Sequence, residues 1–145
     1  MSVAAAMAGR ADLVTVAPHQ KVHEAIKVLA ERRIGAVPVI DGDQLLGILS
    51  ERDLINCLHM EGGAMLDWTV GQVMSPATTV AITTSDLAAL ALITQRRVRH
   101  LAVVDGGVLA GIVSIGDLVK WRLDQIEQEA ANMRAYIRGD YEKRI

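Results

Sequence analysis

The sequence predicts an α/β protein made of two copies of a β-α-β-β-α unit, followed by a C-terminal helix. The main observation is an internal repeat, because one stretch of the chain recurs at a constant offset of 64 residues. Two copies of so long a repeat do not fit a solenoid and indicate similar modules packed as one unit, which we expect to obey pseudo-twofold symmetry. Function is therefore expected at the interface between them. The repeated stretches are 33–42 with 46–54, and 97–106 with 110–118.

Each copy begins with a strand signal and a helix signal. The strand signals are 13–16 and 78–82, which are rich in β-branched residues. In copy one, apolar residues from Val22 to Leu29 follow the helical spacing i, i+3, i+4, i+7. The matching helix of copy two is apolar nearly all round, so we expect it to be the more buried helix. Ser85 and Asp86 are placed to cap its first turn.

A β-hairpin is expected after each helix. Asp-Gly lies between two β-branched runs in each copy, and a tight turn needs the positive φ that Gly and Asp tolerate. Pro38 cannot donate to a strand ladder and is expected at an edge or a strand boundary. A second helix should begin after Ser50 and after Ser114. The predicted strands are 36–40 and 45–49 in copy one, and 101–104 and 108–113 in copy two.

Three predicted segments do not belong to the repeated β-α-β-β-α pattern. Short helices are expected at 3–7 and 70–76, one before each copy. The helix that follows Ser114 continues from Trp121 to Ile137 and has no counterpart in copy one. Its apolar residues alternate with charged ones, so an interface is its expected use. The chain therefore divides into a first unit over 3–61, a second unit over 68–121, and an amphipathic helix and tail over 122–145.

Composition excludes several classes of protein. The 145 residues contain no Phe, so the core must be aliphatic, as in a sheet covered by helices. A net charge of −2 gives no basic footprint for nucleic acid. The longest apolar run, Leu87 to Ile93, is too short to span a membrane. Cys57 stands alone and residues 1–8 lack the basic region of a signal peptide, so we expect a cytoplasmic protein.

One motif in each copy carries a family resemblance. Gly-Ile-Leu-Ser-Glu-Arg-Asp-Leu over 47–54 and Gly-Ile-Val-Ser-Ile-Gly-Asp-Leu over 111–118 each follow an Asp-Gly hairpin. They resemble the signature of cystathionine-β-synthase (CBS) domains, and two in tandem resemble a Bateman module. Residues 96–104 and 114–120 look most similar to stand-alone bacterial CBS pairs. The resemblance implies a homodimer, formed through the helices of the pair and the C-terminal helix.

The resemblance also implies an adenine nucleotide in the cleft between the copies, chiefly AMP, ADP or ATP; some relatives bind NAD(H) or S-adenosylmethionine. Physically, Asp53 or Asp117 can accept hydrogen bonds from both ribose hydroxyls. Ser50 or Ser114, with the first helix amides, can meet a phosphate at the helix N-terminus. Relatives carry phosphate-binding basic residues where Arg99 and His100 stand.

We therefore expect the copy-two cleft, with Asp117, to bind phosphate more strongly than the copy-one cleft, where Arg52 compensates. Adenine is expected between aliphatic side chains such as Val37 and Leu101. Threonines before the helices are further candidates for ligand contact. The predicted nucleotide-binding residues are Ser114, Ile115, Asp117, Arg99, His100, Leu101, Thr79, Ser50, Arg52, Asp53, Val37 and Thr15.

Each of these features also has a purely structural interpretation. Ser-x-x-Asp at a helix start is a capping box even without a ligand. Arg97 and its neighbour Arg96 end a helix, where cations complement the dipole, so we expect a structural role for them. No catalytic constellation and no metal-ligand spacing appear, so we expect neither an enzyme nor an obligatory cofactor. The alternative to a nucleotide sensor is a constitutive scaffold with vestigial clefts. The sequence does not identify the effector protein.

Overall fold

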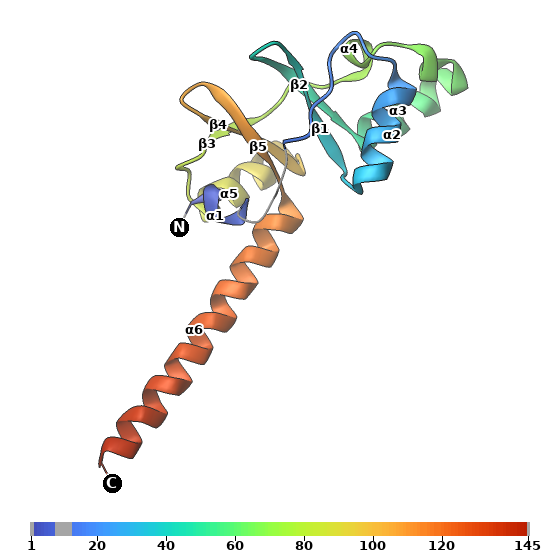
Figure 1. The fold of residues 1–145 in the computed structure, drawn as a ribbon. Coiled ribbons are helices and arrows are strands. Elements are labelled where there is room, and N and C mark those ends of the chain that lie inside the picture. The colour runs from blue at the N-terminus through green and yellow to red at the C-terminus, as the bar shows by residue number, and fades with distance from the viewer. Residues whose placement is uncertain (1, 8–12, 145) are drawn as a thin grey trace.

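The computed structural model describes residues 2–7 and 13–144, with side chains described up to residue 139. It contains two α/β units side by side and a long helix that projects from the second (Figure 1). Residues 1, 8–12 and 145 lie outside the described residues, and with them parts of the predicted N-terminal segment and tail. The elements are α1 (Val3–Ala6), α2 (Val22–Arg32), β1 (Ala36–Asp41), β2 (Gln44–Ser50), α3 (Glu51–Glu61), η1 (Gly62–Asp67), α4 (Val70–Val73), β3 (Thr79–Ala81), α5 (Asp86–Arg96), β4 (His100–Asp105), β5 (Val108–Ser114) and α6 (Ile115–Arg144).

The two predicted hairpins are confirmed. β1 pairs antiparallel with β2, and β4 pairs antiparallel with β5 in the same relative register. Gly42 and Gly106 hold φ values of 60° and 58° in the two turns, which is the left-handed conformation that these turns require. Both hairpins carry a register shift at the same place, between Val39 and Ile40 and between Val103 and Val104. The repeat in the sequence is therefore a repeat in backbone geometry.

The first strand of copy one is the exception, because the prediction over 13–16 is wrong for most of its length. In copy two, β3 pairs in parallel with β4, and the flanking bonds are Ala102 N to Thr78 O at 2.9 Å and Ile82 N to Val104 O at 2.8 Å. In copy one only Val16 bridges Val39.

Two prolines explain the difference. Pro38 stands 64 residues before Ala102, and Pro18 stands 64 residues before Ile82. Neither proline has an N–H, so both flanking bonds of the parallel pair are lost in copy one. Pro38 itself lies buried inside β1, opposite Ile48, and not at a strand boundary. Its nitrogen is tolerated there because the neighbouring segment forms only the single bridge at Val16.

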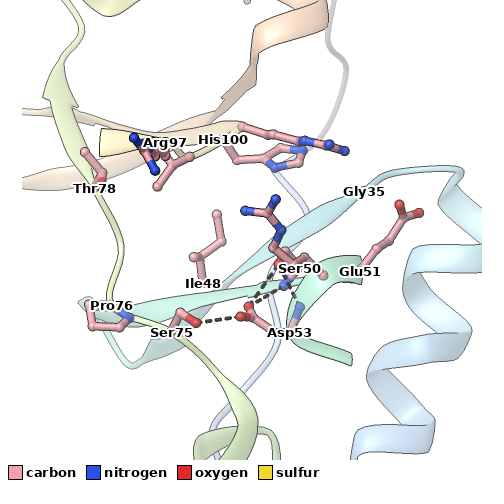
Figure 2. A pocket seen from close by; sticks show the side chains of 13 residues that line it. Gly35, Ile48, Ser50, Glu51, Asp53, Ser75, Pro76, Thr78, Arg97 and His100 are labelled. Atoms are coloured by element: carbon pink, nitrogen blue, oxygen red, sulfur yellow. Dashed lines mark hydrogen bonds between the residues drawn. The ribbon is translucent and has the colours of Figure 1, made fainter. Parts of the chain in front are cut away.

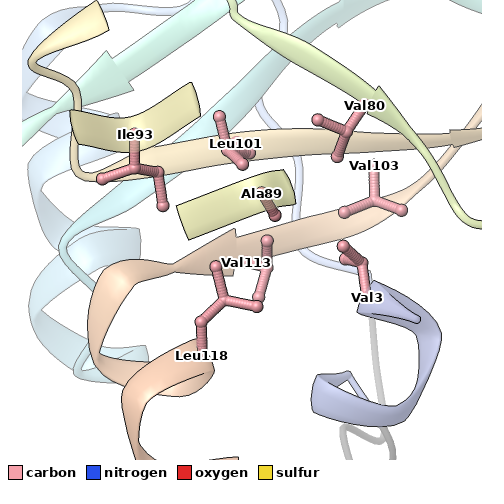
Figure 3. Close-up of a cluster of buried hydrophobic side chains, with 8 residues drawn as sticks. All are labelled: Val3, Val80, Ala89, Ile93, Leu101, Val103, Val113 and Leu118. Carbon is pink, nitrogen blue, oxygen red and sulfur yellow. The ribbon is translucent and has the colours of Figure 1, made fainter. Parts of the chain in front are cut away.

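Each core is completed by the short helix that precedes the other copy. Val3 of α1 lies in the core of copy two with residues of α5, β4 and β5 (Figure 3). Val70 of α4 lies in the core of copy one with residues of α2, β1 and β2. Both valines are fully buried. The units therefore exchange helices, so neither segment 3–61 nor segment 68–121 contains its whole core.

The expectation that α5 is more buried than α2 is wrong. Each helix buries three residues along one face, and Leu87 of α5 is 57% exposed. One buried residue of α5 is Asp86, at its first position, while Ser85 caps the helix by accepting from Ala88 N at 3.1 Å as predicted. Asp86 Oδ2 lies 3.5 Å from Arg122 Nη1, which ties α5 to α6. The apolar outer face of α5 is left exposed.

We expect Ala102→Pro to lower the free energy of unfolding by about 1–3 kcal/mol, because the carbonyl of Thr78 loses its donor in a buried ladder. Urea denaturation would measure the loss. Ala102→Gly is the control, since it keeps the N–H and removes only the methyl group. Equal destabilisation by the two substitutions would contradict the assignment of the copy difference to the missing N–H.

Candidate functional site

A cavity of about 240 Å³ lies where the copy-one motif faces the start of β4 (Figure 2). The serine and aspartate of the motif form one side of it. A basic stretch that runs from the end of α5 into β4 forms the other side, and the linker between the units closes the end. The cavity is lined by Gly35, Ile48, Ser50, Glu51, Arg52, Asp53, Ser75, Pro76, Thr78, Arg97, Val98, Arg99 and His100.

Ser50 and Asp53 form a reciprocal capping box at the start of α3. Asp53 N donates to Ser50 Oγ at 3.2 Å, and Ser50 N donates to Asp53 Oδ2 at 3.0 Å. Ser50 Oγ also donates to Asp53 Oδ2 at 3.0 Å. The structural interpretation of the motif is therefore correct, and it has a consequence for chemistry. The cap holds the carboxylate in one orientation at the start of α3.

The second oxygen of Asp53 is bound by the linker. Ser75 Oγ donates to Asp53 Oδ1 at 2.5 Å. The backbone of Ser75 is fixed against the outer edge of β2, because its N–H and carbonyl each bond with Ile48 at 2.9 Å. A Cβ at Gly47 would lie 2.6 Å from Ser75 O, so only glycine permits this approach. Gly47 of the motif thus brings the linker to the carboxylate.

The opposite side of the cavity is basic. Arg97, Arg99 and His100 line it, and Arg52 joins them from the first turn of α3. Arg97 ends α5 in the left-handed conformation, with a φ of 54°. Arg52, Arg97 and Arg99 form no ion pair with any residue that the structure describes. Three guanidinium groups that lack a protein carboxylate partner suit an anion, because arginine binds phosphate through paired N–H donors.

The structure corrects the assignment of Arg99 and His100 to the cleft of Asp117. Arg99 O accepts from Ile115 N at 2.8 Å within copy two, yet the Arg99 side chain lines the cavity of copy one. A Cβ on Gly35 would lie 3.4 Å from the His100 ring, so the imidazole packs over the glycine that is the counterpart of Arg99. The starts of β1 and β4 therefore face each other, and basic side chains reach across.

In copy two the same motif forms the same cap. Ser114 N donates to Asp117 Oδ2 at 2.8 Å, and Asp117 N donates to Ser114 Oγ at 3.0 Å. Ile115, the first residue of α6, is 40% exposed. None of these three residues lines the cavity beside Asp53. Their capping geometry is shared with copy one, whereas Arg97, Arg99 and His100 line the cavity beside Asp53.

Several other predicted contacts lie elsewhere. Val37 and Leu101 have no exposed surface and belong to the two hydrophobic cores, so the expectation that they flank adenine is wrong. Ile48 and Val98 are the aliphatic residues of the cavity wall. Thr78 lines the cavity in place of its exposed neighbour Thr79 on β3, because neighbouring residues of an extended chain point to opposite sides. Thr15 is half-buried beside the Val16 bridge and lies outside the lining.

Four polar residues of the lining, Glu51, Ser75, Thr78 and Arg97, were not predicted from the sequence. Arg97 was assigned a role at the helix end only, and its left-handed backbone is what turns the chain toward the cavity. Ser75 and Thr78 were not selected, although Ser-Pro after a short helix is a turn signal that places a linker there. The repeat could have predicted the position of the linker residues, because a linker between two facing copies must pass their shared cleft.

Within residues 2–7 and 13–139, no three His, Cys, Asp or Glu side chains cluster as metal ligands would. No helix in that part of the chain combines the length and the apolar character that crossing a bilayer requires.

Comparison with known families agrees with this geometry. The CBS domain model matches residues 6–60 and 70–124, which correspond to the two structural units. The chain belongs to the CBS-domain family. A solved CBS-domain protein from Agrobacterium tumefaciens, ATU1752, is similar at 35% identity with a TM-score of 0.79, over 84% of this chain and 99% of that one. The CBS-pair fold is therefore shown.

Other relatives with CBS domains extend the comparison. YhcV of Bacillus subtilis is 32% identical over 82% of this chain and 83% of its own length. The mitochondrial CBSX3 of Arabidopsis thaliana is 33% identical over 83% of this chain, and the match spans 61% of CBSX3. CBSX2, solved in complex with AMP, is 32% identical with a TM-score of 0.72 over 87% of this chain and 98% of that one.

We expect Ser75→Ala to lower the free energy of unfolding by about 1.5 kcal/mol, because Asp53 loses a donor to a charged oxygen. In an Asp53→Ala background, the same substitution should cost much less. Urea denaturation of the four proteins of this cycle would measure the coupling. Strictly additive effects would show that the contact between Ser75 and Asp53 contributes nothing to stability.

Proposed function

We propose that this protein is a regulatory module without catalytic activity that binds AMP in the cavity beside Asp53. The observation that carries the proposal is a fixed carboxylate that faces Arg97 and Arg99 across one cavity, with Arg52 beside it on α3. A nucleoside phosphate needs an acceptor for ribose hydroxyls and donors for phosphate, and these two sides supply them. That CBSX2 was solved with AMP supports the choice of ligand.

In this proposal the ribose lies on Asp53 and the phosphate on the basic side, near Arg97 and Arg99. The apolar surfaces of Ile48 and Val98 are available for the adenine face. The cavity, at about 240 Å³, falls just below the range of about 300–1,000 Å³ that is usual for small-molecule sites. A mononucleotide therefore suits it better than the dinucleotide NAD(H). ADP and ATP share the same recognition groups and are weaker candidates on size.

The binding signal is proposed to pass through the linker. Ser75, Pro76 and Thr78 line the cavity, and these residues connect the two units. A ribose hydroxyl on Asp53 competes with Ser75 for the Oδ1 oxygen. A ligand shifts a conformational equilibrium only by its difference in affinity for the two states, and this competition provides such a difference. An effector protein, or a second copy in a homodimer, would sense the altered arrangement of the units.

A scaffold function remains the second candidate, and one observation favours it. Several apolar side chains of α3 and α6 are exposed, among them Ile55 at 65% and Met133 at 62%. Exposed apolar residues gathered on helices are typical of interaction surfaces. A scaffold would keep these surfaces paired whether or not a nucleotide is bound. In the proposed sensor, nucleotide binding would change how these surfaces pair.

We expect Asp53→Ala to weaken AMP binding about ten- to a hundredfold, because the ribose loses a charged acceptor. Calorimetric titration would measure the affinity. Asp117→Ala is the matched control, since it removes the equivalent cap at a motif outside this cavity. Equal weakening by both substitutions would refute the placement of the ligand beside Asp53.

Phosphate recognition gives a separate prediction. Adenosine should bind about tenfold or more weakly than AMP, and Arg99→Ala should remove most of that preference. AMP affinity should also fall as salt rises from 50 to 500 mM, whereas adenosine affinity should hardly change. Calorimetry with both ligands at both salt concentrations would test this. Equal affinities for AMP and adenosine in the unaltered protein would remove phosphate from the proposed scheme.

A further inference from the structure

The projecting helix α6 carries an exposed apolar stripe with a seven-residue period. Its members are spaced alternately by four and three residues, which fixes their heptad positions. Leu123, Ala130 and Ile137 occupy position a, and Val119, Ile126 and Met133 occupy position d. All six side chains are exposed, at 55% for Leu123, 50% for Ile126 and 59% for Ile137. Such a stripe on an isolated helix leaves its apolar area in water.

This stripe is not the face by which α6 holds the second unit. Leu118 is fully buried in the copy-two core, and Arg122 reaches Asp86 on α5. Leu118 and Arg122 are four residues apart and share one face, whereas the stripe members lie about 60–140° around the helix from Leu118. Beyond its first turns α6 projects away from both units, so the stripe is open to a partner (Figure 1).

We propose that a second copy of this chain covers the stripe, forming a parallel, in-register, two-stranded coiled coil over residues 119–137. The inference deepens the dimer part of the proposed function by naming its interface and orientation. It does not depend on nucleotide binding.

Charge complementarity selects both the partner and the orientation. In a parallel pair, a residue at position g lies near the residue at position e five places later on the partner. Arg122 at g then faces the partner's Glu127, and Glu129 at g faces the partner's Arg134. Both contacts pair opposite charges. The guanidinium of Arg122 has five N–H donors and can serve Asp86 and a partner together.

The antiparallel arrangement is disfavoured by the same residues. When the apolar layers are aligned antiparallel, position e faces e and position g faces g. Glu127 then faces the partner's Glu127, and Glu129 faces the partner's Glu129. Lys120 faces the partner's Arg134. Every contact between charged residues is then repulsive.

The width of the stripe favours two strands. Five of the flanking e and g positions are charged (Lys120, Arg122, Glu127, Glu129 and Arg134), which narrows the apolar surface toward positions a and d; the exception is Tyr136 at g, which is 73% exposed. A stripe of only two positions in seven is the narrow seam of a coiled coil, whereas bundles with more helices bury a wider face. Leu123 at a with Ile126 at d is an order that shifts the preference of coiled coils toward trimers and tetramers, so the mass of the assembly belongs to the test.

A disulfide test on the full chain distinguishes the orientations. Ile126→Cys in a Cys57→Ser background should form a disulfide-linked dimer on mild oxidation, because equivalent d positions lie opposite each other only in the parallel register. Ala135→Cys in the same background is the matched control, since position f points away from the seam. Absence of the Ile126→Cys dimer, or equal dimer formation by both variants, would overturn the proposal.

Charge reversal supplies a second, independent readout. Arg134→Glu should weaken the dimer about tenfold if the helices are parallel, and should tighten it if they are antiparallel. Adding Glu129→Arg should restore the parallel dimer. Sedimentation equilibrium would measure affinity and mass, and a tetramer would overturn the two-stranded proposal. AMP affinity should be unchanged in these variants, so failure of the coiled coil and failure of the nucleotide proposal are distinguishable.

Discussion

The site depends most on one set of contacts, those that fasten Ser75 to the end of β2. Its backbone pairs with Ile48, and its hydroxyl donates to Asp53 at 2.5 Å. Gly47 makes this possible because a side chain there would collide with the Ser75 carbonyl. The linker is therefore directed past the motif of copy one before it enters copy two. That path brings the basic start of β4 opposite the carboxylate, and the cavity is the space between them.

Local signals in the sequence were sufficient for most elements. The Asp-Gly turns, the helical spacing from Val22 and the Ser85 cap depend on neighbours in the chain, and the structure has all three. The prediction of a strand over 13–16 was wrong because its partner β1 carries Pro38. Comparison of the two copies in the sequence already shows that Pro38 and Pro18 have no proline counterparts in copy two. The burial of α5 could not be read locally, because it depends on which face α1 and α6 cover. Secondary-structure propensity depends on the residues of the segment, whereas burial depends on how the whole fold packs.

The sequence predicted many residues of the site, but it did not predict which of them share a cavity. Ser50, Asp53, Arg52, Arg99 and His100 all line one cavity, whereas the sequence had placed Arg99 and His100 in a second cleft with Asp117. Sequence proximity suggested that Arg99 belongs with Ser114, and their backbones are indeed adjacent through Ile115. The side chain nevertheless crosses to the other copy, because the facing repeats place the start of one hairpin opposite the motif of the other. Only the arrangement of the two copies contains that information.

Capping and ligand binding are usually treated as alternatives, yet a cap can also orient a carboxylate for the ligand proposed above. Two donors hold Asp53 Oδ2 and one holds Oδ1, so the carboxylate is oriented before any ligand arrives. Preorganisation reduces the entropy lost on binding. The identical cap at Ser114 and Asp117 starts α6, the helix that carries the heptad stripe. With α6 fixed to α5 through Asp86 and Arg122, a rotation of the second unit at the cavity must rotate the arm as well. A parallel pair of such arms would resist unequal rotation, so the two protomers would be coupled through the same helix that the motif begins.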